Sequence, residues 1–330
     1  MNSLTASIDG PAAPDAEFQA LVRKTYAGNP AAITALGARL VVGREAPYSP
    51  VDGHALLAEA ARQGDAEAWS YLAVLAAAGV GRPQSWDDAY EAIGRAAALN
   101  HAPSKMLLDI LHDTGIPDAT RAAAWIGTAR GSVISDAPRM VRYPGFLTPA
   151  LCRYFRDRAA PRLKRAQVHD YRLGVLKEDP MRTNTCTPFS LIETDLLIQL
   201  VRARIARAAN VAMGALEPFE VLHYSVGERY TYHIDYFHPD LPNYKDLIAV
   251  KGQRVKTCLV YLNDDYEGGE TDFPKAGVKF RGRAGEALFF DNLLPDGSGN
   301  TKTLHAGLAP IRGEKWLLSQ WIRDRMQRIA

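Results

Sequence analysis

Two histidines and an aspartate in the C-terminal half of the chain have the types and spacing of a metal site. His233 and Asp235 are separated by one residue, and His305 follows later in the chain. Alternate side chains of a β-strand point to the same face, so one strand would present the first two residues to the same ion. A second strand alongside would add the third. Two imidazoles and one carboxylate that leave other coordination positions open suit a catalytic Fe(II) ion.

The H-x-D motif taken alone is weak evidence, because a chain with eight histidines often contains one by chance. A surface histidine or a hydrogen-bonded core histidine is therefore the alternative for each histidine taken singly. His238 is the nearby competitor as a ligand. We expect it at the surface or on the substrate side, because it precedes Pro239 in a segment with the composition of a loop.

Seven segments between Pro138 and Arg325 carry a further signal. In chain order they read YPGFLTPALC, RTN, YSVGERYTYHID, RVKTCLVYLND, GGETDFP, GEALFF and LHAGLAPIRGEKW. Together they resemble the prolyl 4-hydroxylase branch of the 2-oxoglutarate/Fe(II) dioxygenases. The resemblance implies that His233, Asp235 and His305 are the catalytic iron ligands, that 2-oxoglutarate and O2 are cosubstrates, and that ascorbate is a candidate reductant. Family halogenases carry Ala or Gly in place of the aspartate, so Asp235 favours hydroxylation.

A lysine follows the distal histidine on a segment with the pattern of a strand. In KWLLSQW the alternate residues Lys315, Leu317, Ser319 and Trp321 share a face, so the ammonium group would lie among interior residues. A lysine is costly to bury there unless an anion accompanies it. The resemblance assigns Lys315 to the distal carboxylate of 2-oxoglutarate. The alternative is an exposed lysine at the end of the strand.

Two tyrosines are expected near the same cosubstrate. Tyr261 ends the strand-like run TCLVY, and the resemblance assigns its hydroxyl a hydrogen bond to the distal carboxylate. A core tyrosine is the alternative. Tyr224 corresponds to a family tyrosine near the metal. The family's glutamine before it is His223 here, so the local hydrogen bonding departs from the family pattern.

The substrate side of the expected site has fewer markers. Arg182 of RTN corresponds to a family arginine near the substrate groove, with Asn184 where serine is more usual. Tyr230 and Trp316 flank the expected ligands and the lysine, which makes them candidates to line the cavity. Buried aromatic residues more often belong to the core, which is the alternative for both. The long polar segment 236–253 is expected to be a loop of the kind that acts as a lid.

The resemblance implies a hydroxylase that inserts one O2-derived oxygen into an unactivated C–H bond and releases succinate and CO2. A prolyl residue of a peptide is the leading substrate, and a free amino acid or a carrier-bound intermediate is the alternative. A function of another class is a repeat scaffold whose β-domain binds 2-oxoglutarate or a partner without turnover. The intact set of His233, Asp235, His305 and Lys315 argues against that scaffold.

Composition limits the other classes of function. The chain has 330 residues, 47% hydrophobic and 23% charged, which are values of an ordinary globular protein long enough for two domains. A formal net charge of +2 argues against nucleic acid and membrane surfaces as partners. No apolar run is long enough for a bilayer and no signal peptide is recognisable, so we expect a cytoplasmic protein. Three cysteines without a C-x-x-C motif suit a reducing compartment.

The first third of the chain is rich in alanine and repeats itself. GDAEAWSYLAVL at Gly64 aligns with NHAPSKMLLDIL after a shift of 36 residues, and GNPAAITALGAR at Gly28 is a weaker third copy. Such a period is typical of helix–turn–helix solenoids, and the segment resembles tetratricopeptide-like repeats of the Sel-one type. Small residues at equivalent positions, such as Ala60 and Ala96, would permit close helix crossings. The repeats either offer a surface to a protein partner, or support the catalytic domain or a dimer.

From Phe219 onward, short β-rich runs separated by Gly, Pro, Asn and Asp predict a sandwich or barrel. The resemblance specifies a double-stranded β-helix, or jelly roll, with supporting helices. We therefore expect an α+β chain. Its parts are a flexible N-terminus at 1–19, an all-α helical-repeat domain at 20–130, a linker at 131–137 and a dioxygenase domain at 138–330.

Overall fold

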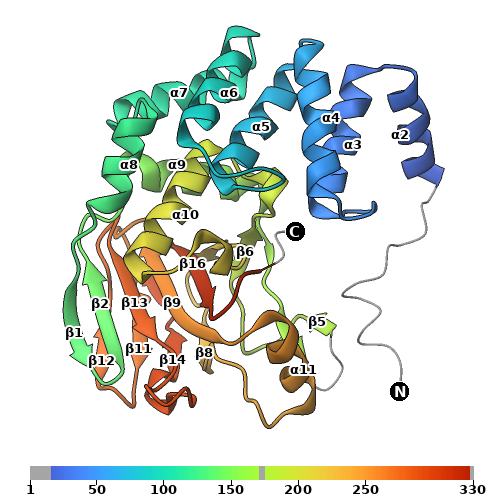
Figure 1. Ribbon diagram of the computed structural model, residues 1–330. Coiled ribbons are helices and arrows are strands. Elements are labelled where there is room, and N and C mark those ends of the chain that lie inside the picture. The colour runs from blue at the N-terminus through green and yellow to red at the C-terminus, as the bar shows by residue number, and fades with distance from the viewer. Residues whose placement is uncertain (1–15, 171–174, 328–330) are drawn as a thin grey trace. The chain divides into compact units, whose positions relative to one another are not determined.

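The computed structural model describes residues 16–170 and 175–327 (Figure 1). Most of the flexible N-terminus expected at 1–19 lies outside the described residues, although a helix begins at Ala16. The chain divides into two compact units. The helical unit runs to Thr128 and also includes Phe189–Arg204, and the β-unit comprises Ala129–Pro188 and Ile205–Gln327. A helical region followed by a β-rich domain is the fold class that the sequence predicts.

The helices before the first strand have the predicted repeat. The α4–α5 pair recurs as α6–α7, each helix beginning 36 residues later, and α3 lies one period before α5. The bounds of these helices are α2 Ala16–Tyr26, α3 Pro30–Val42, α4 Pro50–Arg62, α5 Ala66–Ala78, α6 Trp86–Ala98, α7 Ala102–Asp113 and α8 Ala119–Gly127. The weaker copy at Gly28 is therefore a genuine repeat.

Equivalent capping residues explain why the helices begin and end in register. The side chains of Asn29 and Asp65 accept hydrogen bonds from the amides of Ala32 and Ala68, both at 3.0 Å, at the starts of α3 and α5. Each of these helices ends at a glycine in the left-handed region, with φ near 70°. The shared caps fix the helix lengths and hence the repeat.

Small residues bring the helices close together, as the repeat pattern predicts. Ala60 and Ala96 are fully buried at equivalent positions of α4 and α6. At the crossing of α3 and α4, a Cβ added to Gly53 would lie 2.7 Å from the carbonyl oxygen of Gly37. The helix backbones therefore contact each other directly at this point.

The β-unit is a jelly roll of two antiparallel sheets. The larger sheet has the order β1-β2-β13-β9-β16-β7-β6-β3 and the smaller has the order β12-β11-β14-β8. The larger sheet's strands are β1 Ser132–Asp136, β2 Arg139–Tyr143, β13 Ala287–Asp291, β9 Arg254–Tyr261, β16 Lys315–Arg323, β7 Glu220–Tyr224, β6 Thr185–Pro188 and β3 Lys164–Arg165. Those of the smaller sheet are β12 Val278–Phe280, β11 Thr271–Phe273, β14 His305–Gly307 and β8 Tyr230–His233. Apolar side chains from both sheets form one buried cluster.

Two further strand pairs and several helices complete the β-unit. β4 (Val168–Asp170) pairs with β5 (Val175–Lys177), and β10 (Glu267–Gly268) pairs with β15 (Pro310–Arg312). Helix α9 (Pro149–Ala159) is capped by the side chain of Thr148, which accepts a hydrogen bond from the amide of Leu151, and Pro149 occupies its first position. The segment 236–253, expected as a loop, contains helix α11 (Pro242–Lys251).

The expected boundaries differ from the structure at two places. The linker expected at 131–137 contains edge strand β1, because its β-branched residues pair with β2 in an antiparallel ladder. Phe189–Arg204, expected in the dioxygenase domain, belongs to the helical unit. It contains η2 (Leu191–Glu193) and the first part of α10 (Leu196–Ala209). Arg204 lies over the ring of Trp125 at 4.3 Å, a contact between distant parts of the chain that no local pattern could predict.

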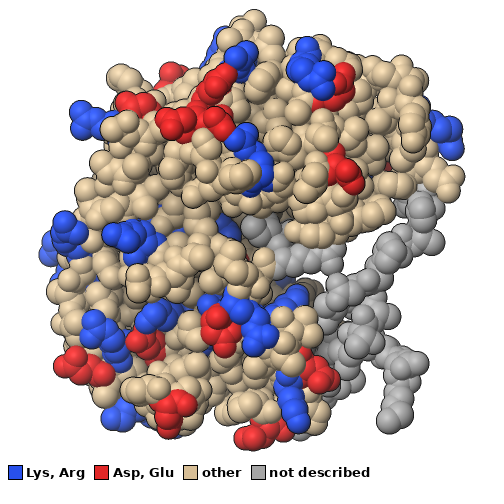
Figure 2. Space-filling model, in the orientation of Figure 1, with Lys and Arg blue, Asp and Glu red and all other residues tan. Residues whose placement is uncertain are grey.

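Acidic and basic side chains are interspersed on the face shown in Figure 2, as the small net charge leads one to expect. Among the described residues, no helix has both the length and the apolar character needed to cross a membrane.

Two glycine substitutions test the close helix contact. Gly53→Ala should destabilise the protein by about 1–3 kcal/mol, because the methyl group would overlap the backbone of α3. Gly94→Ala should stabilise it by about 0.5–1 kcal/mol, because a Cβ there meets nothing within 4 Å and alanine favours the helix. Urea unfolding measures both. Equal stabilisation by the two variants would contradict the direct backbone contact between α3 and α4.

Candidate functional site

Strand pairing brings the two predicted histidine ligands together. β8 ends at His233 and β14 begins at His305, and the two residues are direct partners in the antiparallel ladder. Their ring centroids are 4.3 Å apart. Asp235 follows the end of β8 by two residues, so its carboxylate returns to the same side. The arrangement expected from the H-x-D spacing is present.

The three side chains form a compact set of metal-binding atoms. Asp235 Oδ1 lies 3.7 Å from His233 Nε2, and Asp235 Oδ2 lies 3.9 Å from His305 Nε2. The ligand atoms all lie within 4.8 Å of one another, and the described residues contain no other group of three with this property. Two imidazoles and one carboxylate at these separations fit a single Fe(II) ion.

Backbone carbonyls hold both imidazoles in the tautomer that a metal requires. His233 Nδ1 lies 2.8 Å from the carbonyl oxygen of Thr231, and His305 Nδ1 lies 2.9 Å from that of Thr303. A ring N–H that donates to a carbonyl leaves the Nε2 lone pair free for an ion. Burial, and then the neighbouring His305, lower the pKa of His233 to about 3, so this ring is neutral at physiological pH.

Asp235 is ionised although it is buried. Burial alone would raise the pKa of its carboxyl, but His305, His233 and the hydroxyl of Thr257 together hold that pKa below its ordinary value. The Thr257 hydroxyl donates to Asp235 Oδ2 at 2.6 Å. The anionic form is the one that binds a cation.

Aromatic rings enclose the two histidines. Tyr230 stacks on His233, with ring centroids 3.6 Å apart and an interplanar angle of 13°. Phe273 and Phe290 pack against His305 at centroid distances of 5.2 and 5.1 Å. These contacts restrict the rotation of both imidazoles and keep water from their faces.

Lys315 is fully buried, which excludes the exposed lysine considered as the alternative. Its Nζ donates to the carbonyl oxygen of Gly269 at 2.7 Å, and no described carboxylate lies within the 4.0 Å limit of an ion pair. Burial lowers the pKa of this ammonium group to about 7, and Glu270 opposes the shift only in part. A cation in this position is suited to binding an anionic ligand.

The lysine and the three metal-site residues line one cavity. Alternate residues of β16 face it, as the strand pattern predicts. The lining residues are Arg182, Leu222, Tyr224, Tyr230, His233, Asp235, Leu259, Thr271, His305, Gly307, Lys315, Leu317, Ser319 and Trp321. Trp321 and Thr271 are not among the residues nominated from the sequence. The two-residue period of KWLLSQW contained the signal for Trp321.

Two predicted contacts are displaced from this cavity. Trp316 lies on the other face of β16, because adjacent strand residues point to opposite sides, and its ring is 4.4 Å from that of His223. Tyr261 lies behind the lining, and its hydroxyl is 2.6 Å from Thr271 Oγ1. Thr271 therefore takes the position facing the cavity that the sequence analysis gave to Tyr261.

The remaining predicted residues lie as follows. Arg182 lines the cavity, but its guanidinium group is already paired, with Glu220 at 3.0 Å and with the carbonyl oxygen of Gln167 at 3.0 Å. It lies over the ring of Tyr230 at 5.0 Å and so supports that ring. Tyr224 lines the cavity beside Lys315, with Nζ 5.2 Å from its ring centroid. His238 is exposed and outside the metal-binding group.

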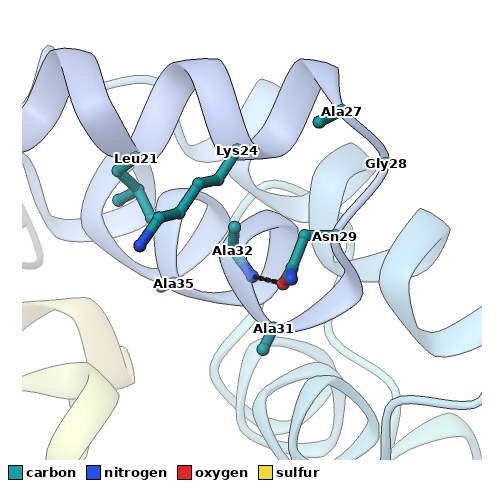
Figure 3. Close-up of a pocket in the computed structure, with 8 residues that line it drawn as sticks. All are labelled: Leu21, Lys24, Ala27, Gly28, Asn29, Ala31, Ala32 and Ala35. Carbon is teal, nitrogen blue, oxygen red and sulfur yellow. Dashed lines mark hydrogen bonds between the residues drawn. The ribbon is translucent and has the colours of Figure 1, made fainter.

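A second concavity lies between α2 and α3 in the helical unit (Figure 3). It is lined by Leu21, Lys24, Gly28, Asn29 and four alanines. Lys24 is the one ionisable side chain among these lining residues, and the side chain of Asn29 caps α3. No set of groups there resembles a catalytic site.

Comparison with known protein families identifies relatives of this chain. Residues 219–323 match the model of the 2OG-Fe(II) oxygenase superfamily. The chain is 31% identical over 225 residues to probable prolyl 4-hydroxylase 10 of Arabidopsis thaliana, covering 62% of this chain and 74% of that protein. A viral collagen prolyl hydroxylase structure from Paramecium bursaria Chlorella virus-1 has 26% identity and a TM-score of 0.44, covering 58% of this chain and 98% of that one. A Sel1 repeat protein from Oxalobacter formigenes has 27% identity and a TM-score of 0.26, covering 28% and 26%.

Removal of the carboxylate should impair metal binding. We expect Asp235→Ala to weaken Mn(II) binding by more than about 100-fold, beyond the 10–100-fold that is typical of outer-sphere changes. Isothermal titration under anaerobic conditions measures the affinity. His238→Ala is the matched control and should bind Mn(II) as the unmodified protein does. Unchanged affinity in the Asp235 variant would exclude this carboxylate as a ligand.

Lys315 should make the stability of the ligand-free protein depend on pH. Its pKa is about 7 in the folded protein against 10.5 for an ordinary lysine, so between these values the unfolded chain binds more protons. Stability from this group therefore rises with pH over that interval, by at most about 1.4 kcal/mol per pH unit. Lys315→Met should lose the rise in urea unfolding and should bind 2-oxoglutarate more than about tenfold more weakly. If the free energy of unfolding varied with pH in the same way in the two proteins, the lowered pKa of Lys315 would be contradicted.

Proposed function

Because the chain belongs to the prolyl 4-hydroxylase-like 2OG-Fe(II) oxygenases, we propose that it hydroxylates a prolyl residue of a peptide or protein. It is a 2-oxoglutarate-dependent dioxygenase, and it uses Fe(II), 2-oxoglutarate and O2. The proposed reaction inserts one O2-derived oxygen into an unactivated C–H bond and releases succinate and CO2.

The observation that carries the proposal is one cavity with a metal-binding set and a buried cation on its walls. His233, Asp235 and His305 supply the metal ligands, and Lys315 supplies the charge that a dicarboxylate needs. A scaffold without turnover would have no need of a metal-binding aspartate and two histidines on the same cavity wall as a buried lysine. The non-catalytic alternative is therefore not favoured.

Bound iron and 2-oxoglutarate would supply the oxidising chemistry, and the residues of the chain would position the reactants and exclude water. The neutral His233 imidazole brings no charge of its own, so the Asp235 carboxylate would offset part of the charge of a divalent ion. Lys315 would pair with the distal carboxylate of 2-oxoglutarate, with Thr271 and Tyr224 beside it on the cavity wall. Tyr261 would act through Thr271, to which its hydroxyl is bonded. The aromatic walls would keep the site dry.

The charges of the cavity favour a peptidyl substrate over a free amino acid. Of the cations on its wall, Arg182 is paired with Glu220, and Lys315 is assigned to 2-oxoglutarate. Neither would be available to the carboxylate of a free amino acid, whereas a residue within a peptide has no such group. Tyr230 and Trp321 offer apolar surfaces that suit a pyrrolidine ring.

The helical repeats supply a surface that suits a protein substrate or partner, as repeat proteins commonly do. We infer that they contribute to recognition of the protein that carries the target proline. A reducing compartment such as the cytoplasm fits the three buried, unpaired cysteines.

Mass spectrometry of products tests the proposed substrate. After anaerobic loading with Fe(II) and 2-oxoglutarate, admission of O2 should add the mass of one oxygen atom to proline-containing peptides, and isotopically labelled O2 should transfer its label. Free proline and other amino acids should remain unmodified. Asp235→Ala is the inactive control. Modification of free amino acids in preference to every peptide would overturn the peptidyl assignment.

A further inference from the structure

A buried chain of hydrogen bonds leads away from Asp235. The Thr257 hydroxyl donates to Asp235 Oδ2 at 2.6 Å, and the side-chain amide of Asn292 donates to the Thr257 oxygen at 3.0 Å. Thr257 and Asn292 are 1% and 0% exposed, so solvent does not replace either bond. Neither residue lines the cavity.

The available protons determine which group donates and which accepts in each of these hydrogen bonds. A threonine hydroxyl has one hydrogen, and an ionised carboxylate can only accept. Thr257 must therefore give its hydrogen to Asp235, and its oxygen is left to accept from Nδ2 of Asn292. This requirement fixes the orientation of the asparagine amide, whose Oδ1 is a buried oxygen without a hydrogen-bond partner.

Asn292 is also linked to His305 through the backbone. Its carbonyl oxygen accepts from the amide of Asn300 at 2.9 Å, and the carbonyl oxygen of Asn300 accepts from the Thr303 hydroxyl at 2.6 Å. The carbonyl oxygen of Thr303 in turn holds His305 Nδ1 at 2.9 Å. One asparagine thus connects the surroundings of two of the three metal-site residues.

We propose that Thr257 and Asn292 are positioning residues that make Asp235 present a single oxygen, Oδ1, to the metal. The Oδ2 atom is engaged by Thr257, whereas Oδ1 has no hydrogen-bond donor among the described residues. A carboxylate free to bind through both oxygens would occupy a position that the cosubstrate needs. The proposal rests on the iron site of the proposed function, but not on the identity of the substrate.

Thr257→Val tests the first link, because valine keeps the shape and removes the hydroxyl. Mn(II) binding measured by titration should weaken by about 10–100-fold, as is typical when a residue that orients a metal ligand is lost. Thr257→Ser restores the hydroxyl and should bind Mn(II) about as tightly as the unmodified protein. Thr187→Val is the matched control, because Thr187 is also buried and bonded, but to the carbonyl oxygen of Ala159.

Asn292→Ala tests the second link. It should weaken Mn(II) binding, and the variant carrying both Thr257→Val and Asn292→Ala should show clearly less than the sum of the two losses, because the asparagine side chain acts through the threonine. Asn263→Ala, which removes another buried asparagine bonded away from the metal site, should leave Mn(II) affinity unchanged. Additive losses would show that Asn292 does not act on Asp235 through Thr257.

A spectroscopic measurement reports the coordination directly. The charge-transfer absorption of the anaerobic Fe(II)–2-oxoglutarate complex should be weaker in Thr257→Val at saturating Fe(II) and unchanged in Thr257→Ser. If the unmodified protein binds Mn(II) and Thr257→Val binds it equally well with an unaltered spectrum, Thr257 and Asn292 do not position Asp235, although the metal site is confirmed. If the unmodified protein binds no Mn(II), the proposed function itself fails.

Discussion

The pairing of β8 with β14 is the constraint on which the site depends. Their register sets His233 opposite His305, and a slip of one residue would turn one imidazole to the other face of the sheet. Jelly-roll closure brings together strands that are far apart in the chain, so the metal site requires the complete β-unit. Phe273 on the adjacent strand β11 and Phe290 on β13 of the larger sheet pack against His305 and tie the site to the hydrophobic core.

The second organising feature is the charge placed in that apolar interior. Lys315 is buried, with its ammonium group bonded to the carbonyl oxygen of Gly269 and near the rings of Tyr224 and Tyr261, at a cost that the β-unit core must offset in the absence of a ligand. Asp235 is stabilised in its ionised form by two imidazoles and a hydroxyl. A cation and a metal-binding set on the same cavity wall match a ligand that is a chelator at one end and a carboxylate at the other.

Much of this could be predicted from the sequence, because short-range periodicity carries the information. The 36-residue period fixed the helix pairs, and the two-residue period of KWLLSQW placed Lys315 in the interior. The structure departs from the expectations where tertiary contacts decide. The sequence does not show that Thr271 lies between Tyr261 and the cavity. The boundary of the helical unit depends on the packing of α10, and β1 forms a strand because it pairs with β2. Trp316 does not line the cavity because it is adjacent to Lys315 on β16, and adjacent strand residues point to opposite faces.

The central claim is that one ion sits among His233, Asp235 and His305 with 2-oxoglutarate reaching from it to Lys315. A crystal structure of the protein grown anaerobically with Mn(II) and 2-oxoglutarate tests it most directly, because the anomalous scattering of manganese locates the ion independently of any model. We expect the strongest anomalous peak between these three side chains, and the distal carboxylate within hydrogen-bond distance of the Lys315 ammonium group. A manganese peak elsewhere, or a cosubstrate oriented away from Lys315, would contradict the account.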